Sequence, residues 1–216
     1  MGVRRLCALF SLLSAVGLAE EESYLALQES KMKLHPALVR GFDAVTERKV
    51  LQYFGPATRS GELVLRGKSM LCVGARGGGE IRAFGSLGAF AVGIDLFPTN
   101  AEYVLKGDAH NLRQFGNGTV DVVYTNILDH IPRLAQFISE VWRVLKPHGL
   151  LISDVFFQTM AQDKWAVRET GTPAFFAEYG GLLRRAGFAE LRRDERQTKQ
   201  RRITHLFHQL NAKGKN

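Results

Sequence analysis

Short apolar runs alternate with helix-like segments from residue 69 to residue 156, and few folds are compatible with this alternation. The apolar runs have the length of strands: SMLCVG, AFAVGIDL, VLKGDA, VDVVYTNI and GLLISDVFF. The segments between them favour helices, beginning with one from about Gly79, then a short one near TNAEYV, then RLAQFISEVWRVLK. Strands that alternate with helices in this way form a parallel sheet through right-handed crossovers. The pattern therefore predicts an α/β domain.

The last third of the chain has a different pattern. After a helix predicted over AFFAEYGGLLRRAGF, the runs AELRRDERQ and RITHLFHQL alternate in character with no helix between them. Two such runs indicate an antiparallel hairpin at the edge of the sheet. We therefore expect a mostly parallel, seven-stranded sheet that ends in an antiparallel hairpin strand.

The net charge of +8 comes almost entirely from the C-terminal end of the chain. Residues 182–216 hold ten Lys or Arg against three acidic residues, a balance of +7. Charged residues on an edge strand prevent it from pairing with other chains, and we favour this explanation over a nucleic-acid or acidic-membrane surface. The stretch RRDERQTKQRR also lacks the interleaved aromatic residues of a single-strand binding groove. We expect no nucleic-acid partner.

The first nineteen residues resemble a secretory signal peptide. Arg4 and Arg5 precede the apolar run LCALFSLLSAVGLA, and EEES follows it. The run is too short to span a bilayer comfortably, so we expect no stable membrane span. The signal peptide predicts a location in the secretory pathway. The alternatives are a buried amphipathic helix and a transit peptide for an organelle.

Three regions follow from these patterns. Residues 1–19 form the predicted signal peptide, residues 20–60 a helical extension, and residues 61–216 the α/β domain. We expect two helices in the extension, broken near LHPAL, and a turn-rich linker at YFGPATRSGE. Only Cys72 would remain after cleavage of a signal peptide that contains Cys7, so the mature chain would have no intramolecular disulfide.

A cluster of glycines in the stretch MLCVGARGGGEIRAF indicates where a ligand binds. Gly74 and residues 77–79, all glycine, occupy the first turn from a strand to a helix, at the carboxyl edge where open parallel sheets bind ligands. Glycine lets the backbone approach a ligand closely, and the free amides at the helix start favour an anionic group. Asp95 ends the second strand, 21 positions after Gly74, where a carboxylate can accept hydrogen bonds from both ribose hydroxyls. Dinucleotides and S-adenosylmethionine both fit.

The dinucleotide fingerprint G-x-G-x-x-G requires glycine at the position of Arg76, which argues against an NAD-dependent oxidoreductase. The segments KGDAHNL, DVVYTNILDHI and RVLKPHGLL point elsewhere. Together with the glycine loop they resemble the class I S-adenosylmethionine-dependent methyltransferases, in particular the broad methyltransferase type 11-like group. The resemblance covers about residues 69 to 210. It implies a Rossmann-like methyltransferase fold and S-adenosyl-L-methionine as the cofactor.

The resemblance also implies roles for residues that match the family's cofactor site. Gly74 and Gly78 match glycines that wrap the methionine part of the cofactor. Asp95 matches the acid that holds the ribose. Asp108, with Ala109 beside it, matches the acid that receives the adenine amino group.

Asn126, Ile127 and Arg76 complete the expected cofactor site. Asn126 and Ile127 fall where the fourth strand opens onto the methionine end of the cofactor. Two residues depart from the family pattern: Cys72 stands where the family usually has an acid, and Arg76 replaces the second loop glycine. With Arg76 at this position, either Arg76 contacts the cofactor carboxylate, or the loop binds the cofactor weakly or not at all. The missing acid commonly organises the loop and the cofactor's ammonium group.

Methyl transfer is an in-line displacement, so a base is needed only where the nucleophile arrives protonated. The candidate catalytic residues are His130 and Asp129, with Tyr124 and His110 further from the strand ends. His130 could deprotonate a hydroxyl or an amine near neutral pH. The alternatives are a packing or capping role for His130 and a helix cap for Asp129. We expect no metal site.

These features predict an S-adenosylmethionine-dependent methyltransferase whose acceptor and oligomeric state the sequence does not identify. The alternative is a non-catalytic binding or scaffold protein with the same fold. Residues 156–176 are rich in aromatic side chains, which would either cover an apolar or ring-bearing acceptor or pack against the sheet.

Overall fold

The computed structural model describes residues 22–30, 36–99, 102–156, 166–196 and 202–210. The chain divides into two units, Met1–Pro36 and Ala37–Asn216. In the first unit, residues 22–30 are helical, while the predicted signal peptide lies outside the described residues. In the described part of the chain, no helix combines the length and the hydropathy required to cross a membrane. The features discussed below belong to the second unit.

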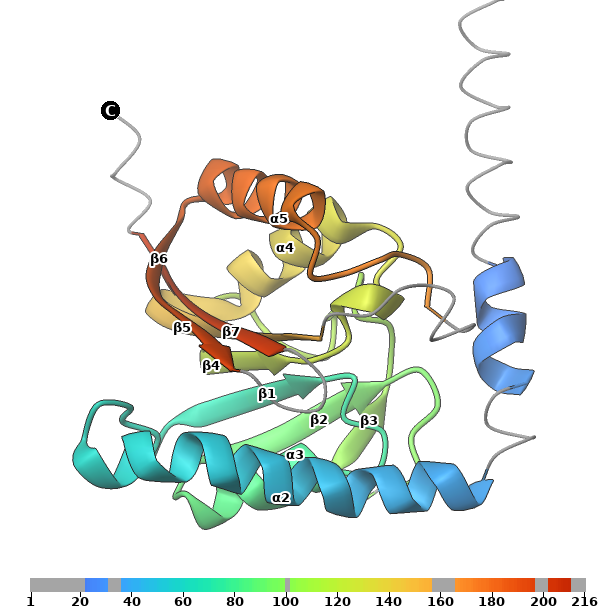
Figure 1. The fold of residues 1–216 in the computed structure, drawn as a ribbon, viewed down its shortest axis with the longest axis horizontal. Coiled ribbons are helices and arrows are strands. Elements are labelled where there is room, and N and C mark those ends of the chain that lie inside the picture. Colours follow the sequence, from blue (N-terminus) through green and yellow to red (C-terminus); the bar gives the residue numbers. More distant parts are fainter. Residues whose placement is uncertain (1–21, 31–35, 100–101, 157–165, 197–201, 211–216) are drawn as a thin grey trace, which may run out of the picture. The chain divides into compact units, whose positions relative to one another are not determined.

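A seven-stranded sheet forms the centre of the second unit (Figure 1), with the strand order β3-β2-β1-β4-β5-β7-β6. The strands are β1 (Ser69–Val73), β2 (Phe90–Asp95), β3 (Val104–Lys106), β4 (Val120–Thr125), β5 (Leu145–Phe156), β6 (Phe188–Arg196) and β7 (Arg202–Gln209). All pairs from β3 to β5 are parallel, whereas β7 is antiparallel to both of its neighbours, β5 and β6. The predicted fold class is therefore confirmed.

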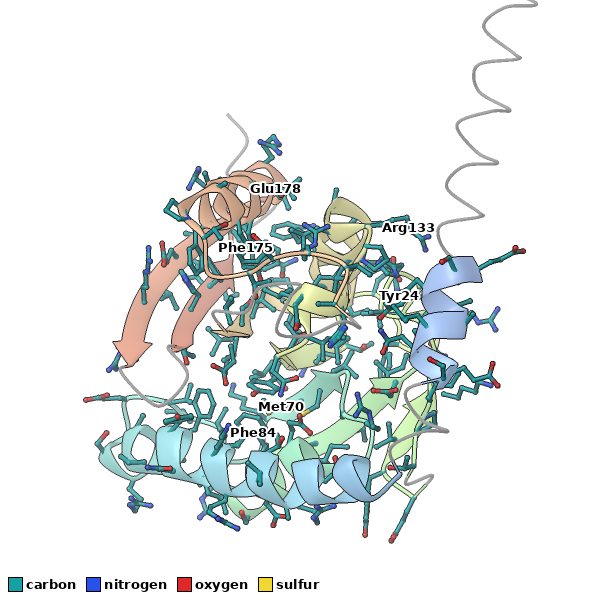
Figure 2. All side chains as sticks on the ribbon, turned by 45° about the vertical axis from the view of Figure 1, so that its right-hand side comes forward. Tyr24, Met70, Phe84, Arg133, Phe175 and Glu178 are labelled. Carbon is teal, nitrogen blue, oxygen red and sulfur yellow. The ribbon has the colours of Figure 1, made fainter. Side chains whose placement is uncertain are left out.

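Helices cover both faces of the sheet. On one face lie α2 (Pro36–Ser60) and α3 (Gly79–Ser86), and on the other lie α4 (Leu134–Val144) and α5 (Pro173–Ala186). Figure 2 shows Met70 and Phe84 in the layer next to α2 and α3, and Phe175 in the layer next to α5. The two apolar layers explain why the inner strands are apolar on both faces.

The central strand β1 divides its side chains between the two layers. Met70 and Cys72 pack toward α2 and α3, while Leu71 and Val73 pack toward α4. All four are at most 2% exposed. A parallel strand buried on both faces has no polar face, so its sequence is a continuous apolar run, as observed here.

The predicted linker at YFGPATRSGE is wrong, because α2 continues through this stretch to Ser60 and contains Pro56 in its interior. Proline removes one helical hydrogen bond and commonly ends a helix. Here Phe54, 3% exposed, packs with its ring 5.3 Å from Phe84 and 6.1 Å from Tyr124. Burial of this aromatic cluster outweighs the local cost of the proline, so tertiary packing keeps the segment helical.

The expected short helix near TNAEYV is not seen in the described residues. Residues 102–103 form a turn, and residues 100–101 lie outside the described range. The connection between β2 and β3 is therefore at least partly a turn rather than the predicted helix.

The C-terminal hairpin forms as predicted, and its charged residues are partly paired. β6 lies at the edge of the sheet, and β7 lies between β6 and β5. Arg192 on β6 forms ion pairs with Glu62 at 2.9 Å and with Asp194 at 2.8 Å. These exposed pairs support the interpretation of this basic segment as a solvated edge.

Helix α2 packs directly against the glycine loop. A Cβ atom on Gly77 would lie 1.6 Å from Oδ2 of Asp43, and a Cβ atom on Gly79 would lie 2.3 Å from the Asp43 carbonyl oxygen. The Gly77 N–H also donates a hydrogen bond to the Asp43 carboxylate. The packing of α2 therefore requires glycine at positions 77 and 79, whether or not a ligand binds to the loop.

Gly79→Ala and Gly85→Ala form a matched pair within α3. We expect Gly79→Ala to reduce the free energy of unfolding by roughly 1 to 3 kcal/mol, because its methyl group overlaps backbone that cannot move aside easily. Nothing lies within 4 Å of a Cβ on Gly85, so Gly85→Ala should be neutral or stabilising by up to about 1 kcal/mol from helix propensity. Urea unfolding of both variants measures the difference. Equal effects would contradict the close contact with α2.

Candidate active site

Two glycines give the loop after β1 its shape. Gly74 has φ +84° and Gly78 has φ +83°, a left-handed conformation that favours glycine. The Gly74 N–H donates to the carbonyl oxygen of Ile94 on β2 at 2.8 Å. A Cβ atom on Gly74 would also lie 2.6 Å from the Ile127 side chain, which follows β4. The loop is thus held between the ends of β2 and β4.

Asp95 ends β2 and is oriented by two backbone amides. The Arg76 N–H donates to Oδ2 at 3.1 Å, and the Phe97 N–H donates to Oδ1 at 2.8 Å. The side chain is half-buried. Each carboxylate oxygen thus retains capacity for another donor, so the arrangement suits a pair of hydroxyl groups. Arg76, with φ +32°, contributes its main chain to this arrangement, and its predicted contact with a cofactor carboxylate stays a prediction.

Asp108 is held by neighbours on its own loop. Its Oδ1 accepts hydrogen bonds from the backbone N–H of His110 at 2.9 Å and from Nδ1 of His110 at 2.7 Å, and its Oδ2 lies 3.7 Å from Nη2 of Arg133. Burial opposes ionisation, but the His110 hydrogen bonds and the Arg133 charge outweigh it and lower the pKa of Asp108. Ala109 beside it is half-buried against the core. The predicted adenine contacts of Asp108 and Ala109 stay predictions.

His110 has a structural role in this arrangement. Its Nε2 accepts the backbone N–H of Arg133 at 3.3 Å, so Nδ1 carries the proton that is donated to Asp108. The residue is only 6% exposed. Nδ1 is thus engaged within the loop after β3 and Nε2 at the start of α4, which argues against His110 as the base.

Glu80, in the first turn of α3, was missed by the sequence analysis. It is 4% exposed, and its Oε1 accepts a hydrogen bond from Nδ2 of Asn126 at 3.1 Å. Burial raises the pKa of Glu80 to about 7. The pKa of the Cys72 thiol is raised by its own burial and, to a smaller extent, by the negative charge of Glu80. The available signal was the acid in GGGE, eight positions after the cysteine that replaces an acid. Sequence spacing alone does not reveal that the two side chains lie together.

Asp129 and His130 lie in a 3₁₀ turn, Leu128–His130, directly after β4. Oδ2 of Asp129 lies 3.7 Å from Nε2 of His130, and their side chains are 9% and 13% exposed. The N-cap positions of this turn and of α4 are held by Ile127 and Arg133, so Asp129 is not at a helix N-cap. The carbonyl oxygen of Asp129 accepts the Val167 N–H at 2.8 Å. The catalytic roles of both residues stay predictions.

Of the two alternatives for the aromatic residues in 156–176, packing against the sheet holds for Phe175 and Phe176. Phe175 is 4% exposed and stacks on Tyr179 with ring centroids 5.6 Å apart. Phe176 lies 5.2 Å from the His205 ring, with the Arg193 guanidinium over its face at 4.9 Å. Residues 157–165, which include Phe157 and Trp165, lie outside the described range.

Most of the predicted cofactor residues occupy one region, because β1, β2 and β4 are parallel neighbours whose carboxyl ends share an edge. They are Gly74, Arg76, Gly78, Asp95 and Asn126. Among residues 22–30 and the described parts of 36–210, no group of three or more His, Cys, Asp or Glu residues is placed to hold a metal ion.

A family model described as a methyltransferase domain matches residues 71–153. That span runs from β1 to β5 and contains the glycine loop, Asp95, Asp108 and Asn126. This match over the central part of the chain supports the class I S-adenosylmethionine-dependent methyltransferase superfamily. It supports an S-adenosylmethionine-dependent methyltransferase with S-adenosyl-L-methionine as its cofactor.

Solved structures of low sequence identity share the fold of this methyltransferase. A 1,6-didemethyltoxoflavin-N1-methyltransferase from Burkholderia thailandensis, with S-adenosylhomocysteine bound, is 17% identical with a TM-score of 0.67, covering 89% of this chain and 90% of that one. A methyltransferase from Archaeoglobus fulgidus is 13% identical, with a TM-score of 0.62 and coverages of 83% and 97%. One from Mesorhizobium loti is 16% identical, with a TM-score of 0.56 and coverages of 72% and 97%. No curated protein matches the chain.

The side chains at the carboxyl edge fit the chemistry of this cofactor. Asp95 has two oriented carboxylate oxygens that suit a ribose, and the loop from Gly74 to Gly78 brings its main chain to the same edge of the sheet. S-adenosylmethionine is cationic at its ammonium and sulfonium groups, and the acids Glu80, Asp43 and Asp95 interact electrostatically with one another. An acidic site of this kind favours a cationic ligand.

The raised pKa of Glu80 predicts a pH-dependent stability. Because the folded pKa of about 7 exceeds the unfolded value of 4.5, the folded state binds more protons between these values, and stability falls as pH rises from about 4.5 to about 7. The loss is complete above this window and is on the order of 3 kcal/mol. We expect Glu80→Gln to remove this pH-dependent loss. The free energy of unfolding of the variant should therefore increase relative to that of the wild type as the pH rises from about 5 to about 8.

Chemical unfolding of both proteins without cofactor, at about pH 5 and about pH 8, measures the difference in the free energy of unfolding. Glu178→Gln is the control, because the Glu178 side chain is 55% exposed. A stability difference between wild type and Glu80→Gln that does not change with pH would contradict the assignment.

Proposed function

We propose that this methyltransferase acts on a neutral hydroxyl or amine acceptor, with His130 as the general base. Bound S-adenosylmethionine supplies an electrophilic methyl group on a sulfonium. The observation that carries the proposal is the Asp129–His130 pair at the carboxyl end of β4, 3.7 Å apart and largely buried. Hydroxyl and amine nucleophiles must lose a proton during methylation, and a histidine can accept it near neutral pH.

Each residue of the site would have a separate role. Asp95 would accept hydrogen bonds from the ribose hydroxyls through oxygens that the Arg76 and Phe97 amides already orient. The imidazole of His130 would take the acceptor proton, and the Asp129 carboxylate would stabilise the resulting imidazolium. The main contribution of the protein is to hold nucleophile and methyl group in line.

We also propose that residues 1–19 direct the chain into the secretory pathway. The support is the sequence alone: two arginines, an apolar run and small residues before EEES. Edman sequencing of the protein secreted from, or retained in, expressing cells would reveal a new N-terminus near Glu20 if the segment is cleaved. An intact Met1 would point to the alternative of a retained helix.

Asp95→Ala should weaken binding of S-adenosylhomocysteine by about 1 to 3 kcal/mol, because hydrogen bonds to a charged group are lost. Calorimetric titration measures the affinity. Asp194→Ala is the control, since Asp194 pairs with Arg192 on the edge strand β6. Equal affinities for wild type and Asp95→Ala would contradict the cofactor site.

His130→Gln should lower methyl transfer about 100-fold or more while cofactor affinity is retained. The measurement is transfer of radiolabelled methyl from S-adenosylmethionine to pooled hydroxyl, amine and thiol compounds, followed by titration of the cofactor into the same variant. Retention of full transfer activity in His130→Gln would eliminate this residue as the base. Absence of transfer to any acceptor, with cofactor binding intact, would favour a non-catalytic binding protein.

A further inference from the structure

Glu80 combines burial with a position beside the glycine loop. It is the second residue of α3, whose N-cap is Gly78, and only 4% of it is exposed. Its carboxylate also accepts its own backbone N–H in the first helical turn. A carboxylate at a helix N-terminus is favoured by the helix dipole. This interaction is worth little compared with the cost of burying a charge.

The side chain that hydrogen-bonds Glu80 is neutral. Asn126 after β4 donates one hydrogen bond, and the Cys72 thiol on β1 interacts electrostatically with Glu80. The charged groups that act on it are Asp43 of α2 and Asp95 of β2, both acids. The arginines nearest the loop, Arg76 and Arg82, act instead on Asp43. Among the described residues, no lysine, arginine or histidine forms an ion pair with Glu80.

A purely structural role would not require an acid at this position. Glutamine could accept the Asn126 hydrogen bond through its own side-chain oxygen and would not carry a buried charge. A buried carboxylate is unfavourable unless a cation or several donors compensate it. The missing positive charge can come from the ligand, because S-adenosylmethionine carries an ammonium group at its methionine end.

Resting on the proposed function, we propose that Glu80 receives the ammonium group of S-adenosylmethionine, and that cofactor binding releases the proton of the Glu80 carboxyl group to the solvent. Glu80 thereby supplies from α3 the negative charge that β1 lacks at Cys72, whose thiol lies close enough to Glu80 to interact with it electrostatically. The proton moves from the carboxyl group to the buffer, and no covalent bond of the cofactor changes.

Cofactor affinity then depends on pH. The acids Asp43 and Asp95 and the burial of the side chain all favour the protonated form of Glu80 in the free protein, whose pKa is about 7. An arriving ammonium favours the ionised form. Affinity for ligands with an ammonium group should therefore rise as pH increases through about 7 and level off above it. A ligand without that group should not show this increase.

Calorimetric titration of the full chain tests the proposal with two neutral thioethers. S-adenosylhomocysteine carries the ammonium group, and 5′-methylthioadenosine lacks the whole amino-acid part. Titrations below neutral pH in two buffers of different ionisation enthalpy give the number of protons released. We expect the wild type to release more than half a proton with S-adenosylhomocysteine and none with 5′-methylthioadenosine.

Glu80→Gln should abolish this proton release, weaken S-adenosylhomocysteine about tenfold or more, and leave 5′-methylthioadenosine affinity unchanged. Adding Cys72→Asp to Glu80→Gln returns a carboxylate to the same locality and should restore part of the affinity. Asp95→Asn is the matched control: it should weaken both ligands and retain the proton release.

Four outcomes distinguish this proposal from the proposed function. Equal proton release by the two ligands in the wild type would overturn the role of Glu80 even if Glu80→Gln does not fold. Unchanged S-adenosylhomocysteine binding and proton release in a folded Glu80→Gln variant would overturn it as well. No binding of either ligand to the folded wild type would overturn both proposals. Binding of S-adenosylhomocysteine with an affinity that does not change through about pH 7 would overturn the role of Glu80 and leave the cofactor assignment intact.

Discussion

The contact between α2 and the glycine loop is the constraint on which the site depends. Asp43 occupies the space where side chains on residues 77 and 79 would lie, and its carboxylate accepts the Gly77 N–H. Both positions must therefore be glycine even without a ligand. The loop is consequently held from two sides, by α2 at Asp43 and by Ile127 at Gly74. A loop constrained in this way presents its main chain in a single arrangement at the carboxyl edge of the sheet.

The same contact concentrates negative charge around the cofactor site. Asp43, Glu80 and Asp95 come from α2, α3 and β2. In addition to burial, the charges of Asp43 and Asp95 raise the pKa of Glu80, and the charge of Asp95 also raises the pKa of Asp43. Backbone amides and arginines offset this cost for Asp43, and two amides support Asp95. In the described part of the chain, the hydrogen-bond donors to Glu80 are Asn126 and its own amide, and they do not offset the burial that raises its pKa. A cationic cofactor completes the compensation.

The local sequence pattern predicted a strand correctly where burial of both faces requires apolar residues throughout. β1 appeared as an apolar run because its side chains fill two layers, and the glycines and Asp95 identified the ligand edge from the chain direction alone. The pattern was misleading at YFGPATRSGE, where Gly55 and Pro56 indicate a turn but Phe54 anchors a helix. Propensity reports the preference of isolated segments, and the packing of one aromatic ring can outweigh it.

The sequence by itself determined the α/β class, the strand that carries the glycine loop and the acid at the end of β2, because period, turn residues and spacing are local properties. Only the tertiary structure decided that Asp43 lies on the loop and that Glu80 lies beside Cys72. Asp43 is 34 positions before Gly77, and no spacing rule links a helix side chain to a loop so distant in the chain. The pKa of Glu80 likewise depends on burial, on the hydrogen bond from Asn126 and on the charges of Asp43 and Asp95 from two other elements, which come together only once the chain has folded.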